Sequence, residues 1–226
     1  MVRRTRVIQR IDLKDQVYEA LKERLLAGDL TPGAPLTLQG IADEMAVSRS
    51  PVQFALTRLC SQRLVDLDSR GYHVRPITAT MMDEAHGVRC ALELYAAEQT
   101  VGRVSPGQLQ RFGELAAQTV KHVENFEFVD KHEYMLANKA FHEYFVDMAG
   151  NEALSDAYRA LNLHELMERV IAGPIRAAGN SSEEHFAIVA AYEAGDLPAA
   201  RAAIIANVET GKRIARTMIE ACGGVA

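Results

Sequence analysis

The stretch from Leu36 to Leu59 constrains the fold more than any other part of this sequence. Thr37 is a good helix N-cap because its hydroxyl can accept a free backbone N–H, and apolar residues recur at helical spacing directly after it. That pattern breaks at Ala46-Val47, and Pro51 soon follows, which suits the first turn of a new helix because an N–H there would be unpaired anyway. The stretch therefore predicts two short helices joined by a tight turn.

The second predicted helix is capped by Ser48 or Ser50 and has two chemically different sides. Its apolar residues share one face, and the side chains that remain outside are polar: Arg49, Ser50, Gln53, Thr57 and Arg58. A donor-rich face at the start of a second helix suits insertion into the major groove of DNA. An ordinary helical hairpin with a solvated face is the alternative, because helical hairpins are common supersecondary units.

Segments on either side of this stretch complete a known order of elements. Asp12 can cap an earlier helix whose end is marked by Gly28, and the segment from Leu64 to Pro76 alternates as a β-hairpin with its turn at Asp68-Ser69-Arg70-Gly71. Helix, helix, helix and hairpin is the order of a winged helix-turn-helix. The candidate DNA contacts in such a domain are Thr37, Ser48, Arg49, Ser50, Gln53, Arg58, Arg70, Tyr72 and His73.

Charge is distributed unevenly along the 226 residues. Residues 1–76 contain 12 Lys/Arg and 9 Asp/Glu, including a basic arm of Arg3, Arg4, Arg6 and Arg10, whereas the remainder contains 13 and 21. The net charge of −5 argues against a general nucleic-acid binder. A basic head joined to an acidic body suits a DNA-binding domain whose companion stays away from phosphates, and chance asymmetry is the alternative.

Everything after a short linker at residues 78–80 has the pattern of helices. Breaks at glycine and proline divide it into the spans 79–102, 106–124, 127–149, 152–172, 182–194 and 198–221. The predicted fold class is mainly α, with a winged helix-turn-helix (three helices plus a β-hairpin wing) over residues 1–77 and an all-α bundle of six or seven helices over residues 78–226. No run of about 18 apolar residues exists, so no membrane span is expected, and three cysteines without metal-site spacing fit a reducing cytoplasm.

Two pairs of polar residues in the second half could carry chemistry. Asn138 and His142 stand four residues apart on one helix face. His185 and Asn207 would lie at one height, ~16 Å from the intervening turn, if their helices form an antiparallel hairpin. The four side chains could converge inside the bundle, where ligand and metal sites are usual, and His164 could join them. Surface polar residues, or buried ones satisfied by neighbours, are the alternative. The histidines expected at the surface are His86, His122 and His132.

Residues 13–76 resemble the DNA-binding head of GntR-type bacterial regulators. The residues that carry the resemblance are Gly28-x-Leu30-x-Pro32-Gly33-x-x-Leu36, Ile41-Ala42, Val47-Ser48-Arg49-Ser50-Pro51-Val52 and Ala55-Leu56-x-x-Leu59. The resemblance implies binding to a DNA operator. The family usually has arginine where this chain has Gln53, so the operator sequence stays open.

The second half resembles the effector domain of the FadR branch of that family, the FCD domain. The matching residues are Arg89-x-x-Leu92-Glu93, Phe141-His142, Gly150-Asn151-x-x-Leu154, Glu184-His185 and Ala194-Gly195-Asp196-x-x-Ala199-Ala200. Many members hold a divalent metal with one Asp and three His at the spacing found here, and Arg89 resembles an arginine that faces the effector. This chain keeps His142 and His185 but has Asn138 and Asn207 at the other two ligand positions.

These two asparagines change what the resemblance implies for ligands. Asparagine carries no charge and is a poor transition-metal ligand, so tight metal binding is not expected, and a bound Zn, Ni or Mn ion is the alternative. A pocket without metal could hold an effector carboxylate directly by charge-assisted hydrogen bonds. The predicted effector site consists of Arg89, Asn138, His142, His164, His185 and Asn207. Asn138→Asp with Asn207→His is expected to create a tighter metal site.

Together with the resemblance, the sequence predicts a cytoplasmic, homodimeric transcription regulator, a repressor, that binds a pseudo-palindromic operator in double-stranded DNA. The helical body would dimerise and bind a small organic acid that shifts the geometry of the head. The chain is not expected to be an enzyme, because it has no nucleophile–base motif, no phosphate loop and no carboxylate-rich metal set. A metal-dependent helical-bundle enzyme and a ligand-free helical scaffold are the alternatives.

Overall fold

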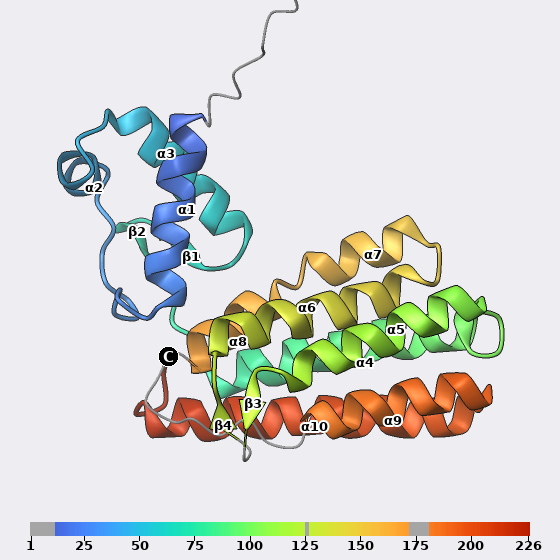
Figure 1. Cartoon of the computed structure of the whole chain (residues 1–226). Coiled ribbons are helices and arrows are strands. Elements are labelled where there is room, and N and C mark those ends of the chain that lie inside the picture. Colours follow the sequence, from blue (N-terminus) through green and yellow to red (C-terminus); the bar gives the residue numbers. More distant parts are fainter. Residues whose placement is uncertain (1–11, 125–126, 172–180) are drawn as a thin grey trace, which may run out of the picture. The chain divides into compact units, whose positions relative to one another are not determined.

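A computed structural model describes residues 12–124, 127–171 and 181–226 of the chain (Figure 1). The described residues form two compact units. The first contains the residues before Pro76 except Leu26–Gly28, and the second contains Leu26–Gly28 and everything described from Pro76 to Ala226. The basic arm predicted at the N-terminus lies outside the described residues.

The first unit is a winged helix-turn-helix, as predicted. Its elements are α1 (Leu13–Leu26), α2 (Leu38–Glu44), α3 (Arg49–Ser61), β1 (Val65–Asp68) and β2 (Gly71–Val74). Helix α1 buries Val17, Tyr18, Leu21 and Leu25 at helical spacing. The same periodicity that predicted the helices therefore forms the core of this unit.

Local chemistry explains the turn between α2 and α3. Thr37 caps α2, because its Oγ1 accepts a hydrogen bond from Gly40 N at 3.1 Å. Gly40 makes room for this cap, since a Cβ there would lie 2.7 Å from Thr37 Oγ1. Ala46 adopts a positive φ of 53° at the turn, and Ser48 precedes α3 as its N-cap residue without a side-chain capping bond. The predicted cap at Thr37 and the predicted break at Ala46 are both confirmed.

The two strands form the predicted hairpin. They pair antiparallel with Asp68 opposite Gly71, which places the turn where the sequence predicted it. Gly71 has a φ of 103°, a conformation open to glycine because it lacks a Cβ. The connector before α2 pairs with β2 as well, through Leu36 N, which donates to Tyr72 O at 2.8 Å. The hairpin is thereby fixed to the rest of the unit.

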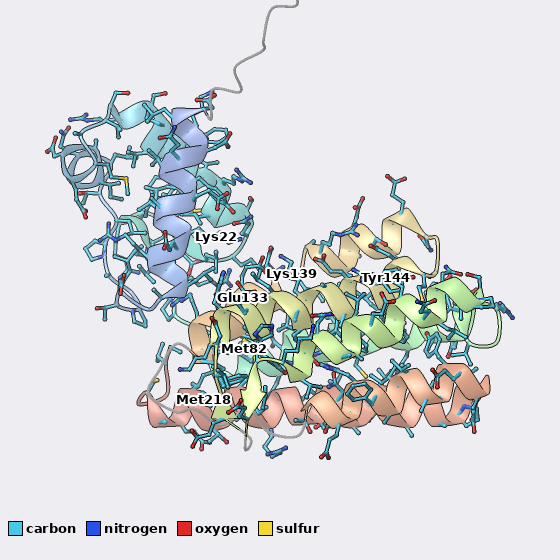
Figure 2. The ribbon with its side chains drawn as sticks, viewed as in Figure 1. Lys22, Met82, Glu133, Lys139, Tyr144 and Met218 are labelled. Carbon is cyan, nitrogen blue, oxygen red and sulfur yellow. The ribbon has the colours of Figure 1, made fainter. Side chains whose placement is uncertain are left out.

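The second unit is a helical bundle. Its helices are α4 (Ala79–Thr100), α5 (Pro106–Val120), α6 (Lys131–Asp147), α7 (Glu152–Arg159), α8 (Leu163–Ile171), α9 (Ser181–Ala194) and α10 (Leu197–Ala221). Helix α10 packs along α4 and α9, and α5 packs against α6 and α9 (Figure 1). Met82 of α4 and Met218 of α10, labelled in Figure 2, are both buried. None of the helices that the structure describes is long and apolar enough to cross a membrane.

An aromatic cluster forms much of the core of the bundle. Phe112 of α5 stacks on Phe141 of α6 with ring centres 4.7 Å apart, and Tyr192 of α9 meets Phe112 edge-on at 5.3 Å. Such pairs contribute beyond the area they bury. The cluster fixes α5, α6 and α9 against one another. His142 follows Phe141 in α6 and therefore lies next to this cluster.

The helical bundle also contains one short pair of strands, which corrects the predicted helix bounds within residues 106–149. The segments β3 (Val123–Glu124) and β4 (Glu127–Phe128) pair as a small antiparallel ladder. Helix α5 therefore ends at Val120, before the predicted end. The reason is local, because valine and phenylalanine favour extended backbone and Asp130 starts α6 by accepting a hydrogen bond from Glu133 N at 3.0 Å.

The predicted span 152–172 is also divided, into α7 and α8. Asn162 lies between them with a positive φ of 48°, a conformation that asparagine tolerates better than most residues. Neither proline nor glycine marks this break, so the helical pattern concealed it.

Candidate functional site

Helix α3 has the two faces predicted from the sequence. Its buried residues are Pro51, Val52, Ala55, Leu56 and Leu59. The exposed residues on the other side are Arg49, Ser50, Gln53, Phe54 and Thr57. Three of the predicted DNA contacts, Arg49, Ser50 and Gln53, therefore share one solvent-exposed face.

The start of α3 is joined to α2 through Arg49. Its Nε donates to Gln39 Oε1 at 2.5 Å, while the side chain stays exposed. The Thr37 oxygen serves as the cap of α2, and Ser48 is exposed. Contacts of these three residues with DNA stay predictions.

Arg58 points to a different neighbour from the other predicted contacts of α3. Its Nη1 donates to Asp15 Oδ1 at 3.3 Å, and its guanidinium carbon lies 3.7 Å from the centre of the Tyr18 ring. Both partners belong to α1, so Arg58 joins α3 to α1 by an ion pair and a cation–π contact. The structure gives this residue a packing role, and its contact with DNA stays a prediction.

The hairpin places its predicted contacts in three different settings. Arg70 lies in the turn with 80% of its side chain exposed, and its hydrogen bonds to Asp68 lower the pKa of that carboxyl. The Tyr72 hydroxyl lies 3.4 Å from Thr57 Oγ1 of α3. His73 is mostly covered, with 16% of its side chain exposed. The hairpin thus offers Arg70 to a partner and contacts α3 through Tyr72.

A cluster of buried polar side chains lies in the second unit, where the sequence predicted a site. Its members, which we call the Arg89 cluster, are at most 5% exposed: Arg89, Glu93, His142, His185 and Asn207. They come from α4, α6, α9 and α10. The helices therefore bring together residues up to 118 positions apart.

Arg89 occupies the centre of this cluster. Its Nε donates to Glu93 Oε1 at 2.8 Å, and its Nη2 donates to Asn207 Oδ1 at 2.6 Å and lies 2.9 Å from His142 Nε2. Nη1 makes no hydrogen bond with any described residue. Burial opposes the charge, but the Glu93 carboxylate raises the pKa of Arg89 above its usual value. Arg89 is therefore a buried side chain that stays positively charged, and its Nη1 group has no hydrogen bond with a described residue.

Glu93 balances this charge. Its Oε1 accepts hydrogen bonds from Arg89 and from Tyr158 OH at 3.0 Å, and it lies 3.1 Å from His142 Nδ1. Its Oε2 is buried without a hydrogen-bond partner among the described residues. Burial alone would raise the pKa of Glu93, but the Arg89 charge and the donors on Oε1 hold it well below its usual range.

The hydrogen bonds of Thr119 assign the tautomer of His185. Thr119 Oγ1 donates to Ala116 O at 2.7 Å, so it accepts from His185 Nδ1 at 3.1 Å. His185 therefore carries its proton on Nδ1 and a lone pair on Nε2, which lies 3.2 Å from His142 Nε2. His142 Nδ1 lies 3.1 Å from both Glu93 Oε1 and Arg89 Nη2.

The imidazoles near Arg89 are neutral at pH 7. Burial, reinforced by the charge of Arg89, lowers the pKa of His142 to about 4 and that of His86 to about 4. Burial also lowers the pKa of His164 and His185 well below the usual range. The charges of Arg89 and Glu93 are therefore the formal charges of the cluster, and they cancel.

A cavity of about 50 Å³ lies beside the cluster. One water needs about 10–15 Å³ by this measure, so the cavity holds a few waters or a ligand of similar size. Its polar lining consists of His86, Arg89, Asn138, His142, His164 and Asn207, and apolar side chains from β4, α6, α8 and α10 line the remainder.

The cavity brings together most of the predicted effector residues. His185 lies behind His142 and does not line the cavity. The amide of Asn207 is already satisfied, because its Nδ2 donates to Glu184 Oε2 at 3.2 Å while its Oδ1 accepts from Arg89. The side chain of Asn138 has no hydrogen bond to another described residue, so its amide group is available to a ligand. Effector binding by these residues stays a prediction.

His86 was expected at the surface, and this expectation is wrong. It is 1% exposed, and its Nδ1 donates to Met82 O at 2.8 Å, which leaves Nε2 as an acceptor. His86 stands three residues before Arg89 and Glu93 four residues after it, so all three share one face of α4. That spacing could have identified both residues from the sequence. His132 is exposed, as predicted.

The residues at the four family metal positions do not fit a divalent ion. Within the part of the chain that the structure describes, no group of three or more His, Cys, Asp or Glu side chains is placed to hold a metal. Asn207 Oδ1 and His142 Nε2, two of the atoms that a metal would need, both lie against an Arg89 N–H. No part of the function is therefore assigned to a metal.

The fold and the two sites define a winged-helix transcription regulator with an additional helical domain. Residues 13–71 match the family described as bacterial regulatory proteins, gntR family, and residues 84–210 match the FCD domain. The chain belongs to the GntR family of bacterial regulatory proteins and carries an FCD domain.

Relatives in sequence are named as regulators, not as enzymes. The chain is 28% identical over 148 residues to the HTH-type transcriptional regulator YdhC of Bacillus subtilis, a match that covers 65% of each chain. It is 31% identical over 109 residues to McbR of Escherichia coli, which covers 48% of this chain and 49% of McbR. The gluconate operon transcriptional repressor of B. subtilis is 28% identical over 172 residues, or 75% of this chain and 67% of the repressor. The chain thus spans about two thirds of YdhC and half of McbR.

Solved structures agree on the fold. E. coli McbR/YncC matches with a TM-score of 0.71 at 23% identity, covering 92% of this chain and 98% of that chain. A GntR-type regulator from Rhodococcus sp. RHA1 matches with a TM-score of 0.70 at 21% identity, covering 89% and 96%. At these identities the likeness establishes the fold alone.

Proposed function

We propose that this chain binds a DNA operator through α3 and the hairpin, and that a small carboxylate in the cavity beside Arg89 changes that binding. The exposed donor face of α3 is the observation that carries the proposal. In winged helix-turn-helix proteins the second helix of the motif lies in the major groove, and side chains near its start reach the base edges. Arg49, Ser50 and Gln53 occupy that position.

We propose further that the protein acts in the cytoplasm as a homodimeric repressor on a pseudo-palindromic operator. Helix-turn-helix dimers match their two-fold symmetry to two half-sites about one helical turn apart. Two relatives are named gluconate operon repressors, one from Bacillus licheniformis and one from B. subtilis. These names support repression as the mode of action.

Arg49→Ala tests the DNA-binding proposal. The substitution is expected to weaken operator binding by about 1–3 kcal/mol if Arg49 contacts a base, measured by fluorescence anisotropy on a site selected from genomic fragments. Arg111→Ala is the control, because it removes the same charge from an exposed position on α5. Unchanged operator affinity in a folded Arg49→Ala protein would refute this placement of the recognition helix.

We propose that Gln53 distinguishes this operator from those of family members that have arginine at this position. Glutamine pairs with adenine through one donor and one acceptor, whereas arginine pairs with the two acceptors of guanine. Gln53→Arg should therefore move the preference toward guanine at one symmetric position in each half-site. Identical motifs selected by the two proteins would contradict this role.

The carboxylate proposal is supported by what the cavity offers. Arg89 presents the N–H groups of Nη1, and Asn138 and His164 line the same space with side chains that have no hydrogen bonds to other described residues. A carboxylate accepts charge-assisted hydrogen bonds from such donors, and these are stronger than neutral ones. The small volume favours an acid of a few heavy atoms.

A thermal shift screen followed by calorimetry tests the effector. Small organic acids are expected to raise the melting temperature, and their uncharged amides are not. Asn138→Leu keeps the size of the side chain, removes its hydrogen bonds and should weaken binding of the acid by about 1–3 kcal/mol. Equal shifts from acids and amides would contradict recognition of the charge, and no shift from any acid would contradict the carboxylate proposal.

A further inference from the structure

We propose that Phe54 of α3 is a further specificity-determining residue, which contacts the C5 methyl group of a thymine in the operator. This role rests on the proposed function, because it requires that the exposed face of α3 enters the major groove. Three features of the structure support it: the exposure of the Phe54 ring, its position on that face, and its contact with Lys14.

Phe54 is an apolar residue of α3 that the core of the head does not bury. Val52, Leu56 and Leu59 of the same helix are 0% exposed, whereas Phe54 is 45% exposed. Phenylalanine is among the residues that folding most often buries. Single exposed apolar residues are nevertheless common on protein surfaces, so the meaning of this exposure depends on which surface carries it.

The surface that carries Phe54 is the face of α3 proposed to enter DNA. Phe54 stands four residues after Ser50 and three before Thr57, and residues at these spacings are neighbours on a helix. Gln53, the preceding residue, projects about 100° away around the helix axis. All four side chains are exposed. The face therefore presents a polar and an apolar side chain next to each other in the second turn of α3.

Lys14 adds a positive charge beside the ring. Its Nζ lies 5.4 Å from the centre of the Phe54 ring, a cation–π contact between the first turn of α1 and α3. The same Nζ lies 3.7 Å from Asp12 Oδ2, and the two side chains are 49% and 57% exposed. Exposed ion pairs of this kind are weak, so a phosphate can take the place of Asp12. An apolar contact bordered by a cation suits DNA, because phosphates flank the base edges of its grooves.

Thymine offers an apolar group that fits the Phe54 ring. It carries its C5 methyl group in the major groove, and phenylalanine is one of the side chains that contact this group. Glutamine at position 53 suits adenine in the same groove, so the two neighbouring residues together favour A·T base pairs. Burial of one methyl group corresponds to about a fourfold change in affinity.

Replacement of thymine by uracil tests this contact, because it removes the methyl group and keeps every hydrogen-bonding group of the base. In the operator selected from genomic fragments, each symmetric pair of thymines is replaced in turn, and affinity is measured by fluorescence anisotropy. For at least one pair, the native chain should bind the uracil form about 16-fold more weakly, which is about fourfold for each half-site. Phe54→Ala should bind the thymine and uracil forms of that operator equally.

A matched control separates this contact from general effects of losing an aromatic ring. Phe186→Ala removes the same side chain from α9, where Phe186 is 43% exposed, and it should keep the full response to uracil. Both residues are exposed, so both variants should fold, and their melting temperatures check this. If Phe54→Ala does not fold, Phe54→Gln removes the apolar contact and takes its place.

A native chain that binds the thymine and uracil forms equally at every position would overturn the role of Phe54. Retention of the native response at every position by Phe54→Ala would overturn it as well. Arg49→Ala reports separately on the placement of α3. If Arg49→Ala weakens binding while uracil has no effect, the placement stands and the role of Phe54 fails alone. If neither change alters affinity, both claims fail.

Discussion

The polar residues of the α3 face and those of the Arg89 cluster differ in their hydrogen-bond partners. Arg49, Ser50 and Gln53 are exposed, so water can replace any lost partner. The cluster residues are at most 5% exposed, and Arg89 is bonded to Glu93 and Asn207 within the cluster. Removing one partner of a buried group leaves the other with its full desolvation cost. Substitutions on α3 should therefore change binding with little effect on stability, whereas substitutions in the cluster should change stability first.

The largest expected effect comes from the buried ion pair. Glu93→Gln keeps the shape of the side chain but leaves Arg89 without a counter-charge, so the free energy of unfolding should fall by about 3–5 kcal/mol. Asp83→Asn is the matched control, because Asp83 pairs with Arg216 at the surface, with side chains 32% and 52% exposed. The control should lose less than about 1 kcal/mol. Equal losses in urea titrations would remove the distinction between buried and exposed pairs.

Acid should destabilise the second unit through its buried histidines. The pKa of His86 is about 4 in the folded protein against an ordinary value of 6.5, so the unfolded chain binds a proton that the folded one does not. The stabilisation is complete above about pH 6.5 and should fall by about 2–3 kcal/mol as the pH drops to about 4.5. His142 acts in the same direction. His86→Gln should reduce the slope of unfolding free energy against pH, and an unchanged slope would contradict the burial of His86.

Two helical glycines should respond to alanine in opposite directions. A Cβ at Gly211 of α10 would lie 2.7 Å from His86 Nε2, and the ring is held by its bond to Met82 O. Gly211→Ala should therefore cost about 1–3 kcal/mol through overpacking. Gly87 of α4 has nothing within 4 Å of such a Cβ, so Gly87→Ala should gain about 0.5–1 kcal/mol from helix propensity. If thermal unfolding shows that both substitutions change stability in the same direction, the His86 ring does not lie against Gly211.

The smallest expected change belongs to the head. Thr37→Ala removes the side-chain cap of α2 and should cost about 1 kcal/mol. Ser50→Ala, on the exposed face of α3, should change stability by less than about 0.5 kcal/mol. Chemical denaturation of the full chain followed by a probe in the head measures both. Equal and negligible effects would show that Thr37 does not stabilise α2.

The head was predictable because its signals are local. The cap at Thr37, the turn at Gly71 and the proline at position 51 each follow from a few neighbouring residues, and helical spacing then fixes the buried faces. The break at Asn162 and the strands Val123–Glu124 and Glu127–Phe128 were not predicted, because no glycine or proline marks them and helical patterns flank them.

The Arg89 cluster was predictable only in part. Spacing placed Asn138 and His142 on one helix face, and the structure brings both to the cavity with Asn207. The contact of Arg89 with Asn207 joins residues 118 positions apart, so it depends on which helices pack together. Burial of His86 depends in turn on the packing of α10 against α4, which periodicity within α4 does not reveal.

Control of the head by the body is the central claim, and operator affinity with and without ligand tests it most directly. The full chain is titrated with its selected operator in the presence of a chelator, with and without a saturating small carboxylate found in the screen. The account predicts at least about a fivefold change in affinity, and Asn138→Leu should reduce that change while keeping the ligand-free affinity. An operator affinity that is identical with and without saturating ligand would contradict the account.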